Sequence, residues 1–522
     1  MNGTPSTMPA GEPGQCAPPA SSRRIGARAI RRGLAVNIVG TLVPTFVALL
    51  CVPAIVSGLG HARFGVLSLA WAFINAVGIL DLGIGRALTR FLAVREDPDE
   101  DHEAAVVWTS LAAILLMGIC GGVAGFGLAG VVARSLARGD PALLAETVSV
   151  LRIMSLSIPL IVLTSGLRGV LEAFGRFDLT NRIWIPTSLL NLLAPVVLLR
   201  AGSPLPVIVS ALVLVRLAGT LLLGRYVLAV LPAMRAPRLC AGGIRSVLAF
   251  AGWVTVSNIP GPLFAQAERF FLGAFAALSA VAFFSTPADL LARVTVIPGA
   301  VLQVTFPVFA QAVGADADRA ARMANRALLF IAAAVLPVLT VLVAVAPEAM
   351  RLWLGPAFGT QGARAGRVLA MGIYVNCMAW LPFSLVQSAG RADWTGKLHA
   401  IEIPIYLVLA AVLIRAAGID GAVLANLLRA TADGALVVWM AARVLGPSGR
   451  LGRRYAVLVG AGVVMMIGAA APVSLALRLL WSATSMVVAT GAAWRFLLDA
   501  EAREAFSSQA ATAWARIRSV AP

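Results

Sequence analysis

The sequence predicts an all-α integral membrane protein with about 14 transmembrane helices, arranged as two pseudo-symmetric six-helix lobes followed by a C-terminal helix pair. The first observation is composition, because 59% of the 522 residues are hydrophobic and 13% are charged, whereas soluble domains carry about 25% charged residues. The second is a series of apolar runs of the length that spans a bilayer, about 20 residues. The third is an internal repeat.

The basic residues fix the expected orientation of these helices. The net charge of +18 would suggest nucleic-acid binding in a soluble domain, but here the mean hydropathy is +0.89. With the N-terminus inside, about two-thirds of the basic residues fall in segments on the inner side, and cytoplasmic segments are enriched in Lys and Arg. We therefore expect a multi-pass protein of the inner cell membrane with both termini in the cytoplasm and no nucleic-acid partner.

The apolar runs divide the chain into six parts. Residues 1–32 are rich in Pro, Gly and Ser and then in Arg, and are expected to form a disordered basic cytoplasmic tail. The other parts are an N-terminal lobe (33–231), a cytoplasmic linker (232–245), a C-terminal lobe (246–446), a further transmembrane pair (447–498) and a cytoplasmic tail (499–522) that is either amphipathic or disordered. The expected helices are 33–57, 64–92, 104–133, 147–174, 180–200, 204–231, 246–277, 281–312, 321–346, 364–389, 398–416, 419–445, 455–476 and 478–498.

A repeated motif supports two lobes in the same orientation. Residues 175–182 read GRFDLTNR and residues 390–397 read GRADWTGK, each after the fourth of six expected helices. Parallel repeats imply a pseudo-two-fold axis along the membrane normal, an arrangement in which transporters place a site between lobes that rock about it. The alternative is a coincidence of ordinary turn residues.

No segment between the expected helices is long enough for a soluble catalytic domain. The longest expected loop is 346–364, and domains typically need about 100 residues or more. We therefore expect no enzyme activity, catalytic residue, cofactor or metal. His61, His102 and His399 are widely spaced and expected at the membrane interfaces, and the Asp316-Ala-Asp318 motif is interpreted as helix capping.

One acid stands out in the second expected helix. Asp81 lies within an apolar run that ends in arginines, beginning with Arg86. A charge in the hydrocarbon is costly unless it faces a partner or a polar cavity, which makes it a candidate functional residue. The alternative is an Asp81–Arg86 pair that closes the end of the helix.

More charges fall at membrane depth in the sixth, seventh and eighth helices. We expect Arg216, Glu268, Arg269, Asp289 and Arg293, with Asp81 and Arg86, to line a substrate cavity. Arg offers permanently charged, bidentate donors for phosphate. Such a cavity would suit a diphosphate headgroup.

Two pairs of charges could instead be satisfied within single helices. Asp289 and Arg293 have the i, i+4 spacing of a helical ion pair, and so do Arg429 and Asp433 in the twelfth helix. For Arg429 and Asp433 the favoured interpretation is a structural ion pair. For Asp289 and Arg293 both readings stay open.

Four groups of residues follow one another along the chain in a recognisable order. They are Phe64-Gly65 with Leu80-Asp81-Leu82-Gly83, Ala267-Glu268-Arg269-Phe270-Phe271-Leu272-Gly273 with Ala282-Phe283-Phe284, Thr305-Phe306-Pro307-Val308-Phe309, and Leu352-Trp353-Leu354-Gly355. In order and spacing they resemble the bacterial polysaccharide-transporter flippases of the multidrug/oligosaccharidyl-lipid/polysaccharide exporter superfamily. The resemblance covers about residues 33–446. The sequence departs from the family pattern at Glu268, where Asp is usual, and at Phe284, where the lost Tyr hydroxyl removes a hydrogen-bonding group.

This resemblance implies a function in the synthesis of lipopolysaccharide or exopolysaccharide. Members of the family move an undecaprenyl-diphosphate-linked oligosaccharide across the inner membrane by alternating access, alongside polysaccharide polymerases and glycosyltransferases. Alternatives within transport are a lipid II flippase and a cation-coupled multidrug extruder, although the extruders favour an acid in the first helix and residues 33–57 contain none. A membrane-embedded glycan polymerase or ligase would be expected to carry a large outer loop. A scaffold without transport activity is a further alternative.

Overall fold

The computed structural model describes residues 27–77, 100–137, 140–237, 260–446, 451–471 and 473–497. Every regular element in these ranges is a helix, and ten of the helices are long and apolar enough to cross a membrane. The all-α membrane fold predicted from the sequence is therefore confirmed. The elements are α1 (Ala27–Val77), α3 (Glu100–Leu136), α4 (Pro141–Ala173), α5 (Phe177–Arg200), α6 (Leu205–Val230), η2 (Pro232–Arg235), α8 (Pro260–Phe275), α9 (Leu278–Ala292), η3 (Arg293–Thr295), α10 (Val296–Ala315), α11 (Ala317–Leu354), η4 (Phe358–Gly362), α12 (Ala363–Ser388), α13 (Ala392–Leu445), α14 (Leu451–Ala469) and α15 (Leu475–Leu497).

Two of these helices are each divided by a glycine. Gly60 in α1 has φ 73° and Gly418 in α13 has φ 56°, values that glycine adopts at little cost because it lacks a Cβ. Each glycine separates two arms, and in α13 the arms correspond to the expected helices 398–416 and 419–445. The division at Gly418 matters for the site, because it lets residues of both arms meet.

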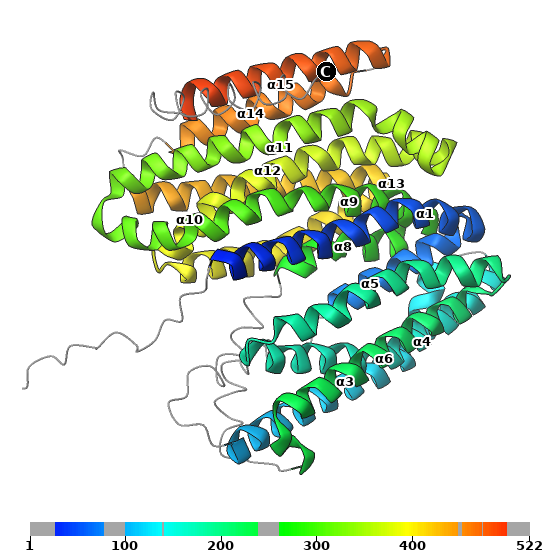
Figure 1. The fold of residues 1–522 in the computed structure, drawn as a ribbon. Coiled ribbons are helices and arrows are strands. Elements are labelled where there is room, and N and C mark those ends of the chain that lie inside the picture. Colours follow the sequence, from blue (N-terminus) through cyan, green and yellow to red (C-terminus); the bar gives the residue numbers. More distant parts are fainter. Residues whose placement is uncertain are drawn as a thin grey trace, which may run out of the picture.

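The helices form two groups that meet at α1 (Figure 1). Helices α3, α4, α5 and α6 pack together around their own apolar cluster. Helices α8 to α13 form the second group, and α14 and α15 lie on its outer side against α11. Helix α1 contacts α4 and α5 on one side and α8 and α9 on the other. Large apolar side chains remain exposed on the outer helices, as a hydrocarbon environment allows.

The two copies of the repeated motif have the same local geometry. Each begins with a glycine of positive φ just after a helix, Gly175 at 68° and Gly390 at 77°. The second and fourth residues of each motif then form an ion pair. The pairs are Arg176–Asp178 at 3.1 Å and Arg391–Asp393 at 3.6 Å. This match supports a true repeat over a coincidence of turn residues.

The expected loop 346–364 is largely helical, which corrects the sequence interpretation. Helix α11 continues to Leu354, and η4 begins at Phe358. The charged Glu348 lowers the hydropathy here, which suggested a loop. In the structure Glu348 lies within α11, and Arg478 of α15 forms an ion pair with its carboxylate. Trp353 then donates a 2.6 Å hydrogen bond to the carbonyl of Leu49 and ties the end of α11 to α1.

The two ends of α11 offer a test of orientation. In a cysteine-free version, single cysteines replacing the exposed residues Asp318 and Thr360 would flank this spanning helix. With the outer envelope made permeable, we expect an impermeant thiol reagent to label Thr360→Cys in intact cells. We expect it to label Asp318→Cys only after the membrane is dissolved, since the positive-inside rule predicts that the basic segments lie inside. The reverse pattern would invert the proposed topology.

Gly65, in the Phe64-Gly65 segment of the family resemblance, lies at a close contact between two helices. A Cβ at this position would lie 2.0 Å from the carbonyl oxygen of Leu278, where α1 crosses the start of α9. We expect Gly65→Ala to destabilise the protein by about 1–3 kcal/mol, the usual cost of overpacking. Thermal unfolding of the detergent-purified protein would measure this. Gly127→Ala on the exposed face of α3 is the matched control, because a Cβ there meets nothing within 4 Å, and equal melting temperatures for both variants would contradict the prediction.

Candidate functional site

Helix α8 carries two adjacent buried charges that face different neighbours. Glu268 accepts a 2.8 Å hydrogen bond from the amide of Asn426 on α13. Arg269 donates to both carboxylate oxygens of Asp289 on α9, over 2.5 and 3.3 Å. Consecutive side chains point in different directions around a helix, so α8 joins α13 through one charge and α9 through the other. The ion pair with Asp289 offsets the cost of burying the positive charge of Arg269.

Arg293 lies beside this pair but is not part of it. Asp289 and Arg293 line one small cavity between α1 and α9, together with Ser68, Thr286 and other residues. The side chain of Asp289 is 56% exposed, and it is paired with Arg269. In the part of the chain that the structure describes, no carboxylate pairs with the exposed Arg293. The expected alternative of an Asp289–Arg293 pair is therefore wrong, because Asp289 pairs with Arg269.

The cavity beside Arg293 is small in this conformation. Its volume is about 70 Å³, which is room for about two water molecules at about 30 Å³ each. An oligosaccharide headgroup cannot fit there unless the helices move apart. The contact between α1 and α9 is thus the one that would have to open.

A second charged cluster lies where the two arms of α13 meet. The turn at Gly418 brings His399 and Glu402 of the first arm beside Arg429 and Asp433 of the second. Arg429 Nη1 lies 3.7 Å from Glu402 Oε1, and His399 Nε2 lies 3.7 Å from Asp433 Oδ1. The expected Arg429–Asp433 pair is corrected here, because the contact between the arms supplies Glu402 as the partner of Arg429.

Aromatic rings surround the cluster, and a cavity reaches it. The guanidinium of Arg429 lies over the ring of Phe264 of α8, 4.7 Å from its centre, and Phe383 of α12 stacks on His399. Glu402 and Asp433 also line a cavity of about 580 Å³ between the two arms of α13. The carboxylates are therefore enclosed by protein on one side and open to a cavity on the other.

This cluster could hold a cation. One donor atom from each of His399, Glu402 and Asp433 lies within 4.8 Å of the others. Arg429 balances one of the two carboxylates, so a proton or a cation would neutralise the other. This group was not predicted from the sequence, where His399 was expected at the membrane interface. Glu402, a lone acid in an apolar helix, was the available signal.

The remaining candidate residues do not join either cluster. Arg216 is half-buried on α6, in the other helix group, and within the described ranges it has no ion-pair partner. Asp81 and Arg86 lie outside the described residues. The structure therefore gathers Glu268, Arg269, Asp289 and Arg293 around α8 and α9, and it leaves Arg216 apart.

Comparisons with known proteins place this fold. The family model described as "Polysaccharide biosynthesis protein" matches residues 59–360. The "Putative O-antigen transporter" of Shigella flexneri is 25% identical over 413 residues, which is 78% of this chain and 96% of the relative. Among solved structures, the lipid II flippase MurJ in an inward closed conformation has a TM-score of 0.68 at 10% identity and covers 89% of this chain and 100% of its own. An inward-facing multidrug resistance MATE family transporter of the MOP superfamily has a TM-score of 0.66 at 17% identity, covering 79% and 98%.

The two structural relatives support the fold alone, and the family model carries the assignment. It spans more than half of the 522 residues, and it includes the charged residues of α8 and α9. The chain therefore belongs to the family described as "Polysaccharide biosynthesis protein".

Proposed function

We propose that this protein is a flippase that moves an undecaprenyl-diphosphate-linked oligosaccharide from the inner to the outer leaflet of the inner membrane. The observation that carries the proposal is Arg293, which has no carboxylate partner among the described residues and lies beside the Arg269–Asp289 pair, where α9 meets α1. A guanidinium without a carboxylate partner suits a diphosphate, which accepts bidentate hydrogen bonds. The relative from Shigella flexneri, named as an O-antigen transporter, supports the same class of cargo.

The arrangement of helices suits alternating access. We place the two lobes at residues 33–231 and 246–446, with the additional pair at 447–498 and both termini in the cytoplasm. Helix α1 contacts α8 and α9 across the boundary between the helix groups. Rocking of the lobes would widen the small cavity beside Arg293 and admit the headgroup. Transport by this route needs no catalytic residue.

A cation-coupled extruder is the second candidate, because one group of residues could couple transport to a cation. The cluster of His399, Glu402 and Asp433 carries one more carboxylate than Arg429 balances. Such a group could take up a proton or a cation during transport. Either cargo would be compatible with it, so the cargo has to be tested directly.

Deletion of the gene separates these functions. If the protein is a flippase, the deletion strain should lose surface polysaccharide and accumulate lipid-linked oligosaccharide in the inner leaflet. The wild-type gene should reverse both effects. Normal polysaccharide with increased sensitivity to toxic compounds would instead identify an extruder. Accumulation of the lipid-linked unit in the outer leaflet would point to a polymerase or ligase.

A further inference from the structure

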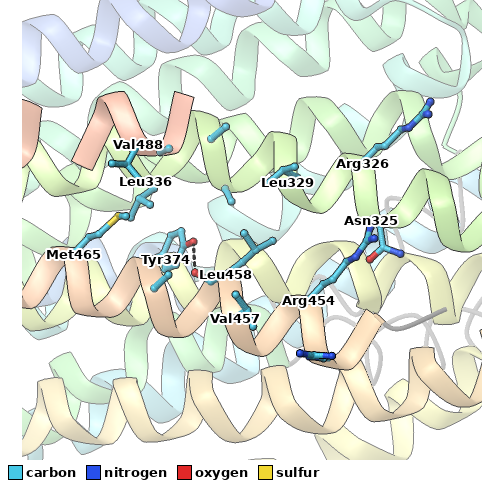
Figure 2. Close-up of a pocket in the computed structure, with 15 residues that line it drawn as sticks. Asn325, Arg326, Leu329, Leu336, Tyr374, Arg454, Val457, Leu458, Met465 and Val488 are labelled. Atoms are coloured by element: carbon cyan, nitrogen blue, oxygen red, sulfur yellow. Dashed lines mark hydrogen bonds between the residues drawn. The ribbon is translucent and has the colours of Figure 1, made fainter. Parts of the chain in front are cut away.

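A groove separate from both charged clusters lies between α11, α12, α14 and α15. Its volume is about 560 Å³. Figure 2 shows that one end carries Arg326 and Arg454, whereas Leu336, Met465 and Val488 lie at the other end. Arg453 also lines the groove. The groove is therefore amphipathic along its length.

Small side chains leave this space open. Ala332 and Ala333 of α11 and Ala461 of α14 line the groove. Tyr374 of α12 forms part of the wall, and its hydroxyl donates a 3.0 Å hydrogen bond to the carbonyl of Leu458. The hydroxyl of this buried tyrosine therefore has a hydrogen-bond partner within the protein. The rest of the wall beyond the arginines is mainly apolar and suits a hydrocarbon chain.

The depth of the groove matches one leaflet of the bilayer. From Arg454 to Met465, α14 rises about 16 Å at 1.5 Å per residue, and the hydrocarbon core is about 30 Å thick. A groove of this depth accommodates an acyl chain from a single leaflet. An isoprenoid chain that follows a headgroup across the membrane would need a longer path.

The charged end suits an anion. Arg453 and Arg454 lie in the first turn of α14, where the helix dipole disfavours positive side chains and favours a bound anion. Both are exposed, and among the described residues neither has a carboxylate partner. No Asp or Glu lines the groove. A phosphate at this point would contact guanidinium groups and the helix N-terminus together.

We propose that this groove binds an anionic phospholipid of the cytoplasmic leaflet, with its phosphate at Arg453 and Arg454 and one acyl chain along α11 and α14. The positive-inside orientation puts the arginines at that leaflet. Lipid bound there would hold α14 and α15 against α11. This inference stands independently of the transported cargo.

Native mass spectrometry of the delipidated, detergent-purified protein tests the proposal. The protein is offered equal amounts of phosphatidylglycerol and phosphatidylcholine with the same acyl chains. We expect wild type to bind phosphatidylglycerol about ten-fold better, since each Arg near the headgroups adds attraction to an anionic lipid. Arg453→Gln with Arg454→Gln should remove this preference.

Two further variants make the result specific. Arg319→Gln with Arg322→Gln removes the same charge from the exposed start of α11, outside the groove, and should keep the preference. Ala461→Trp fills the groove and should reduce binding of both lipids. An unchanged preference in the Arg453/Arg454 variant would overturn the proposal.

Competition identifies the occupant. Inorganic phosphate should not displace phosphatidylglycerol, because it lacks the acyl chain that occupies the apolar part of the groove. Full displacement by phosphate would show a simple anion site and overturn the proposal. Displacement by a polyprenyl diphosphate at lower concentration than phosphatidylglycerol would assign the groove to the cargo and overturn it as well.

Discussion

Replacing Arg429 with alanine should remove most of the folded protein from the membrane. The side chain is only 10% exposed and lies 3.7 Å from Glu402, so alanine leaves the buried Glu402 carboxylate without its positive partner. Breaking a buried ion pair from one side costs about 3–5 kcal/mol. That loss is a large fraction of the about 5–15 kcal/mol that stabilises a typical protein. Quantitative blotting of isolated membranes would measure the remaining protein.

A second substitution should reverse this loss. Arg429→Ala with Glu402→Gln removes the uncompensated carboxylate and should restore much of the abundance. Arg415→Ala is the control, because Arg415 lies exposed on the same helix against Phe275 and outside the cluster. Normal abundance of the single variant with loss of polysaccharide export would show that the cluster acts in transport and not in stability.

Replacing Arg293 with alanine should stop polysaccharide export and leave the protein folded. Arg293 is exposed and, in the described part of the chain, has no carboxylate partner, so its removal strands no buried charge. A charge-assisted hydrogen bond contributes about 1.5–3 kcal/mol, and a bidentate contact with phosphate contributes more than one bond. We therefore expect export to fall by more than about ten-fold. Arg293→Lys should keep part of the function, since it keeps the charge without the bidentate geometry.

The comparison with Arg269 sharpens this prediction. Arg269 is buried and bonded to Asp289, so Arg269→Ala should lower both abundance and export. Arg319→Ala, at the exposed start of α11, should change neither. Surface polysaccharide and membrane abundance are measured together in each strain. Normal polysaccharide in the Arg293→Ala strain would remove Arg293 from the cargo site.

The sequence was sufficient to predict the helices because membrane length and hydropathy are local properties. The expected helix 204–231 matches α6 (Leu205–Val230), since a spanning segment must satisfy its own backbone hydrogen bonds. Asp316 caps α11 as expected, accepting a 2.8 Å hydrogen bond from the backbone of Arg319. The exact total of 14 helices stays a prediction.

Partners between helices could not be predicted from spacing. Glu268 meets Asn426 and Arg429 meets Glu402 only because α13 divides at Gly418 and packs beside α8. From its i, i+4 spacing, Arg429 was expected to pair with Asp433, but in the fold it pairs with Glu402. Asp289 could in the same way have paired with Arg293, but it pairs with Arg269. The continuation of α11 to Leu354 was missed for the same reason, because Arg478 of α15 pairs with Glu348 from a distant part of the chain.

The most direct test of the proposed flippase function is translocation by the purified protein in vesicles. A fluorescent oligosaccharide linked to undecaprenyl diphosphate is placed in both leaflets, and an impermeant quencher reports the fraction in the outer leaflet over time. We predict that wild type makes the inner-leaflet pool accessible, and that Arg293→Ala leaves it protected although the vesicles contain the same amount of protein. A wild-type protein that leaves the inner-leaflet pool protected under an imposed proton gradient, sodium gradient or membrane potential would contradict the proposed flippase function.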